Sequence, residues 1–383
     1  MRSFEPKLPT LQNPVLMPIR ICRGLVKPLA FHTSSSNFSK KNPKNLNLKF
    51  FRNKFDGSLK LYKQFKPSDT KPLKGLIFKE PEFHLKSVLK KLKKYKKSKV
   101  FAFTYKDKSL AELCVHKINI FYLSKFLKLN FFSNIETIIS KFFKINTTRK
   151  NKIDSLVILR HVWEHVSDHK KLIRKIFDIC DKNSIFYIEV PDSFKQIKSF
   201  DYSILWEDHI YYYDKIGFIN SLKNSNFEII EFKKFNQDYE DIYCAICKYN
   251  KNKKLKIKKS HIMLKYTDYF KNNFKIFKNK INKKFYKLSK SGEIVFFGAS
   301  HMMNTYINIF NLEKYVSYIL DDNEVKQNKF MFKNSIKIFP FSKVFKKFPK
   351  FCILSINPSN KKVINKISIL EANGVKIKNI FKI

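Results

Sequence analysis

A short apolar strand that ends in titratable side chains decides the fold of this chain: Asp154-Ser-Leu-Val-Ile-Leu-Arg-His-Val-Trp-Glu-His-Val-Ser-Asp168. The apolar residues predict a buried strand over 154–159, and the polar residues follow at its carboxyl end. In an open α/β sheet, ligands bind at the edge formed by the carboxyl ends of the strands. We therefore expect His161, Glu164 and His165 to lie at a binding site.

Further apolar runs lie on both sides of this stretch, and segments with helical periodicity separate them. In the first part of the chain the pattern predicts strands over 99–104, 119–123, 184–190, 227–232 and 241–247, with helices over 81–97, 110–116, 170–180 and 216–225. A second series begins at residue 292, with strands over 293–298, 316–321, 351–355 and 375–381 and helices over 300–310 and 358–370. Strands that alternate with helices predict an α/β protein with doubly wound, mostly parallel sheets.

A lysine-rich segment connects the two series. Residues 248–290 contain 16 lysines and one acidic residue, and large apolar residues recur there at spacings of three and four. The spacing predicts an amphipathic helix that bridges two domains, with membrane-surface binding by its basic face as the alternative. The expected organisation is a poorly ordered basic arm over 1–81, an α/β domain over 82–247, a connecting helix over 248–291 and a Rossmann-like domain over 292–383.

The composition restricts the partners. The 383 residues carry a formal net charge of +47, but the charge is spread along the chain and no RRM, KH, zinc-finger or helix-turn-helix signature concentrates it. We therefore expect no specific nucleic-acid partner, and a diffuse basic surface or attraction to a nucleotide-sugar diphosphate or lipid headgroup instead. No apolar run approaches the roughly 18 residues that a transmembrane helix requires.

The cysteines and the first residues bear on location. Six cysteines are scattered, and the pair Cys244 and Cys247 forms a C-x-x-C inside a predicted strand, with no second pair at zinc spacing. We expect structural thiols in a reducing, cytoplasmic environment. The first 38 residues are rich in Arg and Ser with one acidic residue, which indicates a disordered leader or, alternatively, an organellar transit peptide.

Two further segments concentrate titratable side chains. Ile188-Glu-Val-Pro-Asp192 is a second strand end that turns polar, and Leu205-Trp-Glu-Asp-His-Ile-Tyr-Tyr-Tyr213 has the density of a pocket wall. A histidine beside a carboxylate, as at positions 208 and 209, can act as a general base, or it can be a hydrogen-bonded structural histidine. The histidines at 161 and 165 also have a spacing that could hold a metal on one helical face, but no third ligand is placed and no metal is expected.

Taken in order, Arg-His-Val-Trp-Glu-His-Val-x-Asp, Glu-Val-Pro-Asp and Trp-Glu-Asp-His-Ile-Tyr-Tyr-Tyr resemble the class I, S-adenosylmethionine-dependent sugar C-methyltransferases. The second unit is similar to the Rossmann-like domain that follows in that family, through Phe297-Gly-Ala-Ser-His with Asn304, Leu320-Asp-Asp-Asn-Glu-Val-Lys326 and Ile353-Leu-Ser-Ile-Asn-Pro358. The resemblance covers about residues 82–383. It implies methylation of a carbon in a nucleotide-linked keto-sugar, in polysaccharide or deoxysugar biosynthesis.

The resemblance also implies roles for single residues. His209, flanked by Asp208, corresponds to the base that removes the proton beside the ketone. The cofactor-binding positions are Phe103, Thr104, Tyr105, Lys106, His161, Glu164 and His165, and the substrate-binding positions are Glu207, Tyr212, Glu189 and Asp192.

The chain departs from the family at the cofactor loop. Thr104, Lys106 and Lys108 stand where glycines let the backbone approach the cofactor, and Tyr122 stands where an acid binds the ribose. The family's cysteine-rich zinc module is absent as well. Three interpretations follow: an active enzyme with a rebuilt loop, a non-catalytic protein that binds sugar nucleotides or serves assembly, and a methyltransferase that binds nucleic acid.

Overall fold

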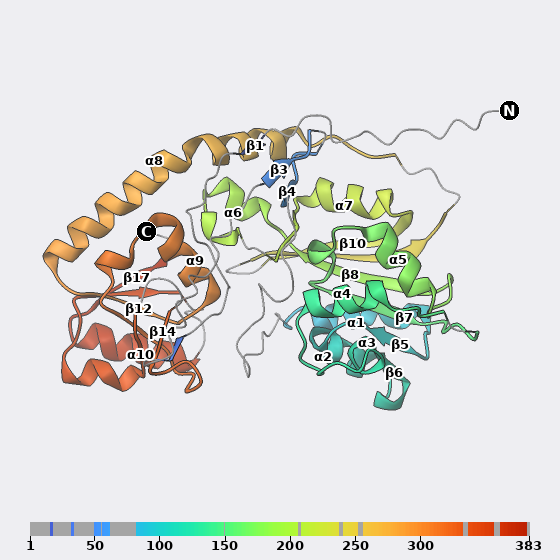
Figure 1. Ribbon diagram of the computed structural model, residues 1–383, viewed down its shortest axis with the longest axis horizontal. Coiled ribbons are helices and arrows are strands. Elements are labelled where there is room, and N and C mark those ends of the chain that lie inside the picture. Colours follow the sequence, from blue (N-terminus) through green and yellow to red (C-terminus); the bar gives the residue numbers. More distant parts are fainter. Residues whose placement is uncertain are drawn as a thin grey trace.

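The computed structural model describes residues 16–17, 32–33, 50–54, 56–61, 82–148, 150–205, 208–236, 240–251, 256–331, 336–355 and 361–380. Two α/β units follow one another along the chain, each with its own sheet, and a long helix connects them (Figure 1). Most of the leader, the positions of Trp206 and Glu207, and the residues around Pro358 lie outside the described residues.

The first sheet has six strands. Its order is β10 (Phe227–Phe235), β11 (Ile242–Tyr249), β8 (Ile185–Pro191), β7 (Leu156–Arg160), β5 (Val100–Ala102) and β6 (Ile120–Tyr122). Neighbours pair in parallel from β8 to β6, whereas β11 runs antiparallel to both β8 and β10. This is the doubly wound, mostly parallel sheet expected of a class I methyltransferase-like fold.

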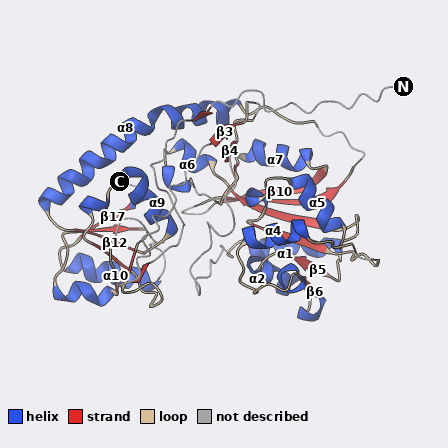
Figure 2. Cartoon of the chain, in the orientation of Figure 1, coloured by secondary structure: helices blue, strands red, loops and turns tan. Residues whose placement is uncertain are grey.

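Helices cover both faces of this sheet, because side chains that alternate along each strand point to opposite sides. Phe101, Val157 and Phe186 pack in the hydrophobic cluster of α4 (Ile135–Lys144), α5 (His169–Phe177) and α7 (Lys215–Asn224). The neighbouring strand residues pack on the other face with α1 (Leu85–Leu92) and α2 (Lys108–Cys114), and α3 (Leu123–Phe126) follows β6. Figure 2 shows these helices around the strands.

The C-x-x-C of β11 is divided between the two faces of the sheet. Cys244 belongs to the cluster of α1 and α2, and Cys247 belongs to the cluster of α4, α5 and α7. Three residues along a strand reverse the direction of the side chain, so the two thiols cannot meet at one metal ion. Both are buried free thiols, as the sequence predicted.

The second sheet is parallel throughout, in the order β15 (Ile338–Phe339), β13 (Tyr318–Leu320), β12 (Ile294–Phe297), β16 (Phe351–Leu354) and β17 (Lys376–Asn379). Helices α9 (His301–Phe310) and α10 (Lys361–Ala372) connect its strands. A two-stranded pairing of β14 (Lys329–Phe330) with β2 (His32–Thr33) lies outside this sheet.

The connecting helix α8 spans His261–Ser291 and lies along the outer edge of the molecule in Figure 1. It begins later than the sequence predicted, because the Ser260 hydroxyl caps it by accepting from the Met263 amide. Its apolar seam packs as expected. The rings of Phe270 and Tyr202, from the first α/β unit, stack with centroids 4.1 Å apart, and those of Phe285 and Phe296, from the second, stack with centroids 6.2 Å apart. The two α/β units therefore share one hydrophobic cluster along α8.

A hairpin lies within the segment 1–81, which the sequence predicted to be a poorly ordered arm. β3 (Phe50–Arg52) and β4 (Leu59–Leu61) pair with each other, β1 (Leu16–Met17) pairs with β3, and β9 (Tyr211–Tyr212) pairs with β4. Burial of Phe50 and Leu59 holds the hairpin in place. Short helix α6 (Phe194–Lys198) packs on α8 nearby. Within the described part of the chain, no helix combines the length and apolarity needed to cross a bilayer.

Candidate active site

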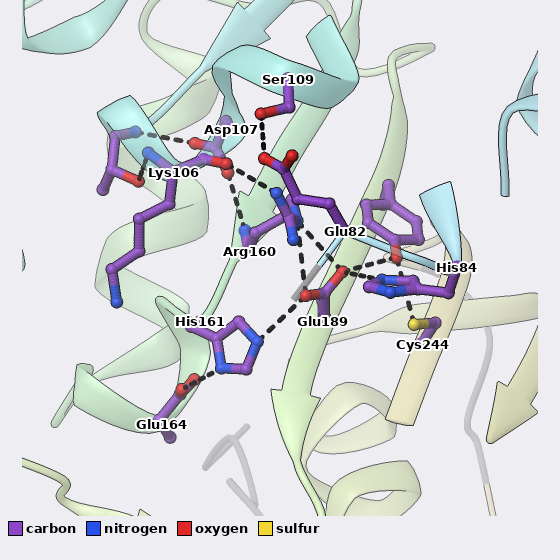
Figure 3. Close-up of polar contacts among 12 residues, drawn as sticks. Glu82, His84, Lys106, Asp107, Ser109, Arg160, His161, Glu164, Glu189 and Cys244 are labelled. Atoms are coloured by element: carbon purple, nitrogen blue, oxygen red, sulfur yellow. Dashed lines mark hydrogen bonds and ion pairs between the residues drawn. The ribbon is translucent and has the colours of Figure 1, made fainter. Parts of the chain in front are cut away.

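The predicted polar strand ends do meet at one edge of the first sheet. Arg160 ends β7, Glu189 lies near the end of β8, and the loop after β5 lies beside them (Figure 3). The pairing of Arg160 with Glu189 in the register of β7 and β8 places the two charged side chains next to each other. The edge contains two groups of side chains, which His161 connects.

The first group is an ion-pair network around Glu189. Its carboxylate lies 3.2 Å from Nε of Arg160, 2.9 Å from Nε2 of His84 and 3.0 Å from Nε2 of His161, and it accepts from the Tyr187 hydroxyl at 2.7 Å. The Arg160 and Glu189 side chains are completely buried. Burial would raise the pKa of Glu189, but the charge of Arg160 and the hydrogen bonds from the two histidines hold it well below its usual value. Glu189 is therefore a buried carboxylate that fixes the strand ends.

The loop after β5 is closed by side chains instead of glycines. Thr104 caps the short 3₁₀ helix Tyr105–Asp107, and Asp107 accepts hydrogen bonds from the Thr104 amide at 2.7 Å and the Arg160 amide at 2.9 Å. The Arg160 guanidinium donates to the Lys106 carbonyl at 2.7 Å. Burial raises the pKa of Asp107 to about 7, against the opposing effect of these hydrogen bonds. The Asp107 carboxylate thus holds the turn after β5, where the methyltransferases that this chain resembles have glycines.

His161 joins the first group to the second. It has a left-handed backbone with φ of +49°, a conformation that is strained for a residue with a side chain. Its amide donates to the Glu189 carbonyl at 2.9 Å, and its Nδ1 lies 3.5 Å from Glu164. The strained turn directs the chain from the end of β7 into the 3₁₀ helix Trp163–His165.

The second group consists of Glu136, Glu164, His165, Asp208 and His209. Nδ1 of His165 lies 2.7 Å from Glu136 of α4, and its Nε2 lies 4.0 Å from Glu164. The His209 ring meets the His165 ring edge to face, with centroids 4.7 Å apart. The Ile210 amide donates to the Glu164 carbonyl at 2.8 Å, which joins the loop of His209 to the end of β7.

The charges of the second group are unbalanced. Burial would lower the pKa of His165, but the Glu136 carboxylate raises it, and His165 in turn lowers the pKa of Glu136. Burial, followed by the charge of Glu136, raises the pKa of Asp208 to about 6. Among the described residues, neither carboxylate oxygen of Glu164 has a hydrogen-bond donor, and Oδ1 of Asp208 has none either. Three carboxyl groups around His165 make this group suitable for a cationic ligand.

The same group includes the donors for a metal ion. Glu164, His165 and His209 place one ligand atom each within 4.8 Å of one another, as do Glu136, His165 and Asp208. The sequence had considered His161 with His165 on one helical face instead. Among the described residues His161 belongs to neither set of donors: its Nε2 lies 3.0 Å from Glu189, whereas Nδ1 of His165 lies 2.7 Å from Glu136.

The remaining predicted positions lie in different surroundings. Phe103 is fully buried in the core against Phe142, so only its backbone reaches the loop. Asp192 is fully buried and paired with Lys234 at 2.7 Å. The expected roles of Asp192 and Glu189 in substrate binding stay predictions. The Tyr212 ring packs on Phe50 and has its centroid 5.9 Å from that of His209.

The Tyr105 ring contacts Phe132 at 5.5 Å, close to the loop that Lys106 belongs to. Glu207 lies outside the described residues.

Four residues of the site carried no assigned role in the sequence analysis: His84, Asp107, Glu136 and Arg160. His84 and Glu136 lie 105 and 29 residues from their partners Glu189 and His165, so no local spacing indicates them. Asp107 and Arg160 stood inside segments already considered, and an acidic residue in a loop without glycine was a signal that could have been used.

Comparisons with known proteins agree with this architecture. A family model described as a methyltransferase domain matches residues 104–231, and one described as a C-methyltransferase C-terminal domain matches residues 250–380. A comparison with curated proteins finds no match.

Among solved structures, the chain is similar to the 1,6-didemethyltoxoflavin-N1-methyltransferase of Burkholderia thailandensis, with 8% identity, a TM-score of 0.30, and coverage of 44% of this chain and 78% of that chain. It is also similar to the N-terminal domain of EvdMO1, determined in the presence of S-adenosylhomocysteine and D-fucose, with 7% identity, a TM-score of 0.29, and coverage of 45% and 85%. A possible histamine N-methyltransferase of Thermotoga maritima has 11% identity and a TM-score of 0.26, with coverage of 43% and 89%.

The two family models together match residues 104–231 and 250–380, and the strand order of the first sheet agrees with them. The chain is a class I S-adenosylmethionine-dependent methyltransferase that carries the C-terminal domain of the C-methyltransferases.

Proposed function

We propose that this chain transfers the methyl group of S-adenosylmethionine to a carbon beside the ketone of a nucleotide-linked sugar, in polysaccharide or deoxysugar biosynthesis. The observation that supports this most is the contact of His209 with the acidic second group at the carboxyl ends of β5 and β7. In this proposal residues 82–247 and 292–383 are the two domains, joined by 248–291. Free cysteines throughout the described chain support a reducing, cytoplasmic location.

The site fits the cationic end of the cofactor. S-adenosylmethionine carries a sulfonium and an ammonium, and Glu164 and Asp208 offer buried carboxylate oxygens without hydrogen-bond donors among the described residues. When bound, the cofactor supplies an electrophilic methyl group. Asp107 occupies the Thr104 amide, so the loop would contact the cofactor through Tyr105 and Lys106.

His209 is the proposed base. It is nearly buried, with 8% of its surface exposed, and it follows the carboxyl group of Asp208. The imidazole in this place accepts the proton from the carbon beside the ketone. The His209 ring packs against His165, and its centroid lies 5.9 Å from that of the Tyr212 ring. In this proposal the sugar binds between the loop of His209 and β9.

His165 complements the base. Burial opposes ionisation of His165, but the Glu136 carboxylate raises its pKa and thereby favours the ring that carries two N–H groups, and Nδ1 is used by Glu136. Its Nε2 then donates a hydrogen bond to the oxygen of the ketone, where negative charge develops when the proton leaves. This role depends on the Glu136 carboxylate, which fixes both the charge and the direction of the ring.

The test separates the proton transfer from the methyl transfer. His209→Ala is expected to reduce methylation of a panel of nucleotide-linked keto-sugars by about 10²–10⁴-fold and to abolish exchange of the substrate's α-proton with deuterated water. His116→Ala changes an exposed histidine in the same domain and serves as the matched control. Calorimetry with S-adenosylhomocysteine checks that the cofactor site of the variant is intact.

Near-wild-type proton exchange in His209→Ala would remove His209 from the mechanism. Failure of the folded wild-type protein to bind S-adenosylmethionine at millimolar concentration would contradict the proposed reaction, and a nucleotide sugar that still binds would indicate a non-catalytic binding protein.

A further inference from the structure

The outer face of α8 exposes apolar and basic side chains side by side. We define it by its exposed side chains, which are Ile262, Lys265, Tyr269, Ile276, Lys280, Lys283, Tyr286, Lys287 and Lys290. Ile262 and Ile276 are each 63% exposed, and Tyr269 and Tyr286 are 45% and 52% exposed. Isoleucine on a solvated helix face costs free energy that lysine or glutamine would not.

The exposed isoleucines and tyrosines of α8 do not belong to its packed face. The opposite face of α8 already packs into the shared hydrophobic cluster through Met263, Phe270, Ile281 and Phe285. Ile262, Tyr269 and Ile276 are seven residues apart, a spacing that puts them on one side of a helix. They form a second apolar stripe, on the side of α8 opposite its packed face in the described part of the chain.

The charged side chains of α8 are almost all basic. The helix contains nine lysines and a single acidic residue, Asp268, and Asp268 is paired with Arg52 of the hairpin. Nζ of Lys265 lies 5.7 Å from the centroid of the Tyr269 ring, and Nζ of Lys290 lies 5.5 Å from that of Tyr286, which are cation–π contacts. Lysines that surround an apolar stripe can extend their ammonium groups to phosphates while the stripe enters the acyl region.

We propose that the outer face of α8 binds in the plane of an anionic lipid bilayer. A helix of 31 residues is about 46 Å long, which provides an extended contact parallel to the membrane. Its position at the edge of the molecule leaves this face accessible (Figure 1). The two isoleucines favour a bilayer over RNA, because a nucleic-acid groove offers phosphates but no apolar layer for them. This inference is independent of the reaction proposed above.

The experiment measures binding of the full chain to sonicated vesicles at about 150 mM salt, with phosphatidylcholine alone or with phosphatidylglycerol added. Binding to the anionic vesicles only is expected. Ile262→Ser with Ile276→Ser, and separately Lys280→Gln, Lys283→Gln, Lys287→Gln and Lys290→Gln together, should each weaken the partition coefficient at least about tenfold. The matched control removes four lysines from another exposed surface, through Lys93→Gln, Lys94→Gln, Lys96→Gln and Lys99→Gln, and should bind as the wild type does.

Three results would overturn the proposal. The first is no binding to anionic vesicles by folded wild-type protein. The second is an equal loss in the control variant, which would mean that the overall charge of the chain, not α8, attracts the membrane. The third is an unchanged partition coefficient of the double isoleucine variant, together with binding of a single-stranded RNA that depends on the α8 lysines, which would make the face a polyanion site.

Discussion

Replacing Arg160 by methionine tests whether the network around Glu189 holds the edge of the sheet together. The substitution keeps a long apolar side chain in the same space and removes the charge. Glu189 would then be a buried carboxylate next to His84, His161 and Tyr187, without its permanently charged partner. The Lys106 carbonyl would lose its donor at the same time.

The burial of the pair gives the size of the effect. Both side chains are inaccessible to solvent, and removal of one partner of a buried pair costs about 3–5 kcal/mol of the free energy of unfolding. Lys91→Met breaks the pair of Lys91 with Glu231, whose side chains are 39% and 21% exposed, and should cost about 1 kcal/mol or less. The double variant Arg160→Met with Glu189→Gln removes the uncompensated charge, so it should be more stable than Arg160→Met alone.

Urea unfolding followed by tryptophan fluorescence measures these differences. Trp163 is fully buried and stacks on His169 at 4.1 Å, three residues from Arg160, so its emission reports on this part of the first domain. A loss below about 1 kcal/mol in Arg160→Met, or a double variant less stable than the single one, would refute the account of the network.

Two other predictions concern the site and the hairpin. Because burial and Glu136 raise the pKa of Asp208 to about 6, and a bound cation favours its ionised form, affinity for S-adenosylmethionine should fall by up to about tenfold per pH unit below pH 6. Calorimetry between pH 7.5 and 5 measures it, and a profile in the Asp208→Asn variant as steep as that of the wild type would contradict it. Gly57→Ala should cost about 2 kcal/mol or more, because Gly57 has φ of +73° and an added Cβ would lie 2.5 Å from the Leu264 amide nitrogen. Gly374→Ala has the same backbone strain, with φ of +76°, but open space, so thermal unfolding should show the smaller loss there, and equal losses would exclude the clash as the cause.

The central strands of the first sheet could be predicted from the sequence because they are buried on both faces. β7 and β8 consist of continuous apolar residues that end in charge, and this pattern gave both the strands and the edge where the site lies. The seam of α8 was equally clear, since its phenylalanines recur over several turns. Its first turn was not, because the start depends on the cap at Ser260.

The hairpin and half of the site could not be predicted in this way. Each hairpin strand has three residues, and its partner strand β9 lies about 150 residues later in the chain, so its stability comes from long-range burial of Phe50 and Leu59. Glu136 entered the site through a helix that was not predicted, and its importance follows only from its contact with His165. The sequence did indicate the absence of loop glycines, and the structure shows Asp107 and Arg160 in their place.

The hairpin of β3 and β4 also limits how the protein can move. On one side Arg52 contacts the Leu264 carbonyl and Asp268 of α8. On the other side the Leu61 amide bonds to the Ile210 carbonyl, next to the loop of His209. A movement of α8 relative to the first domain would therefore displace the hairpin, and with it the loop of the proposed base.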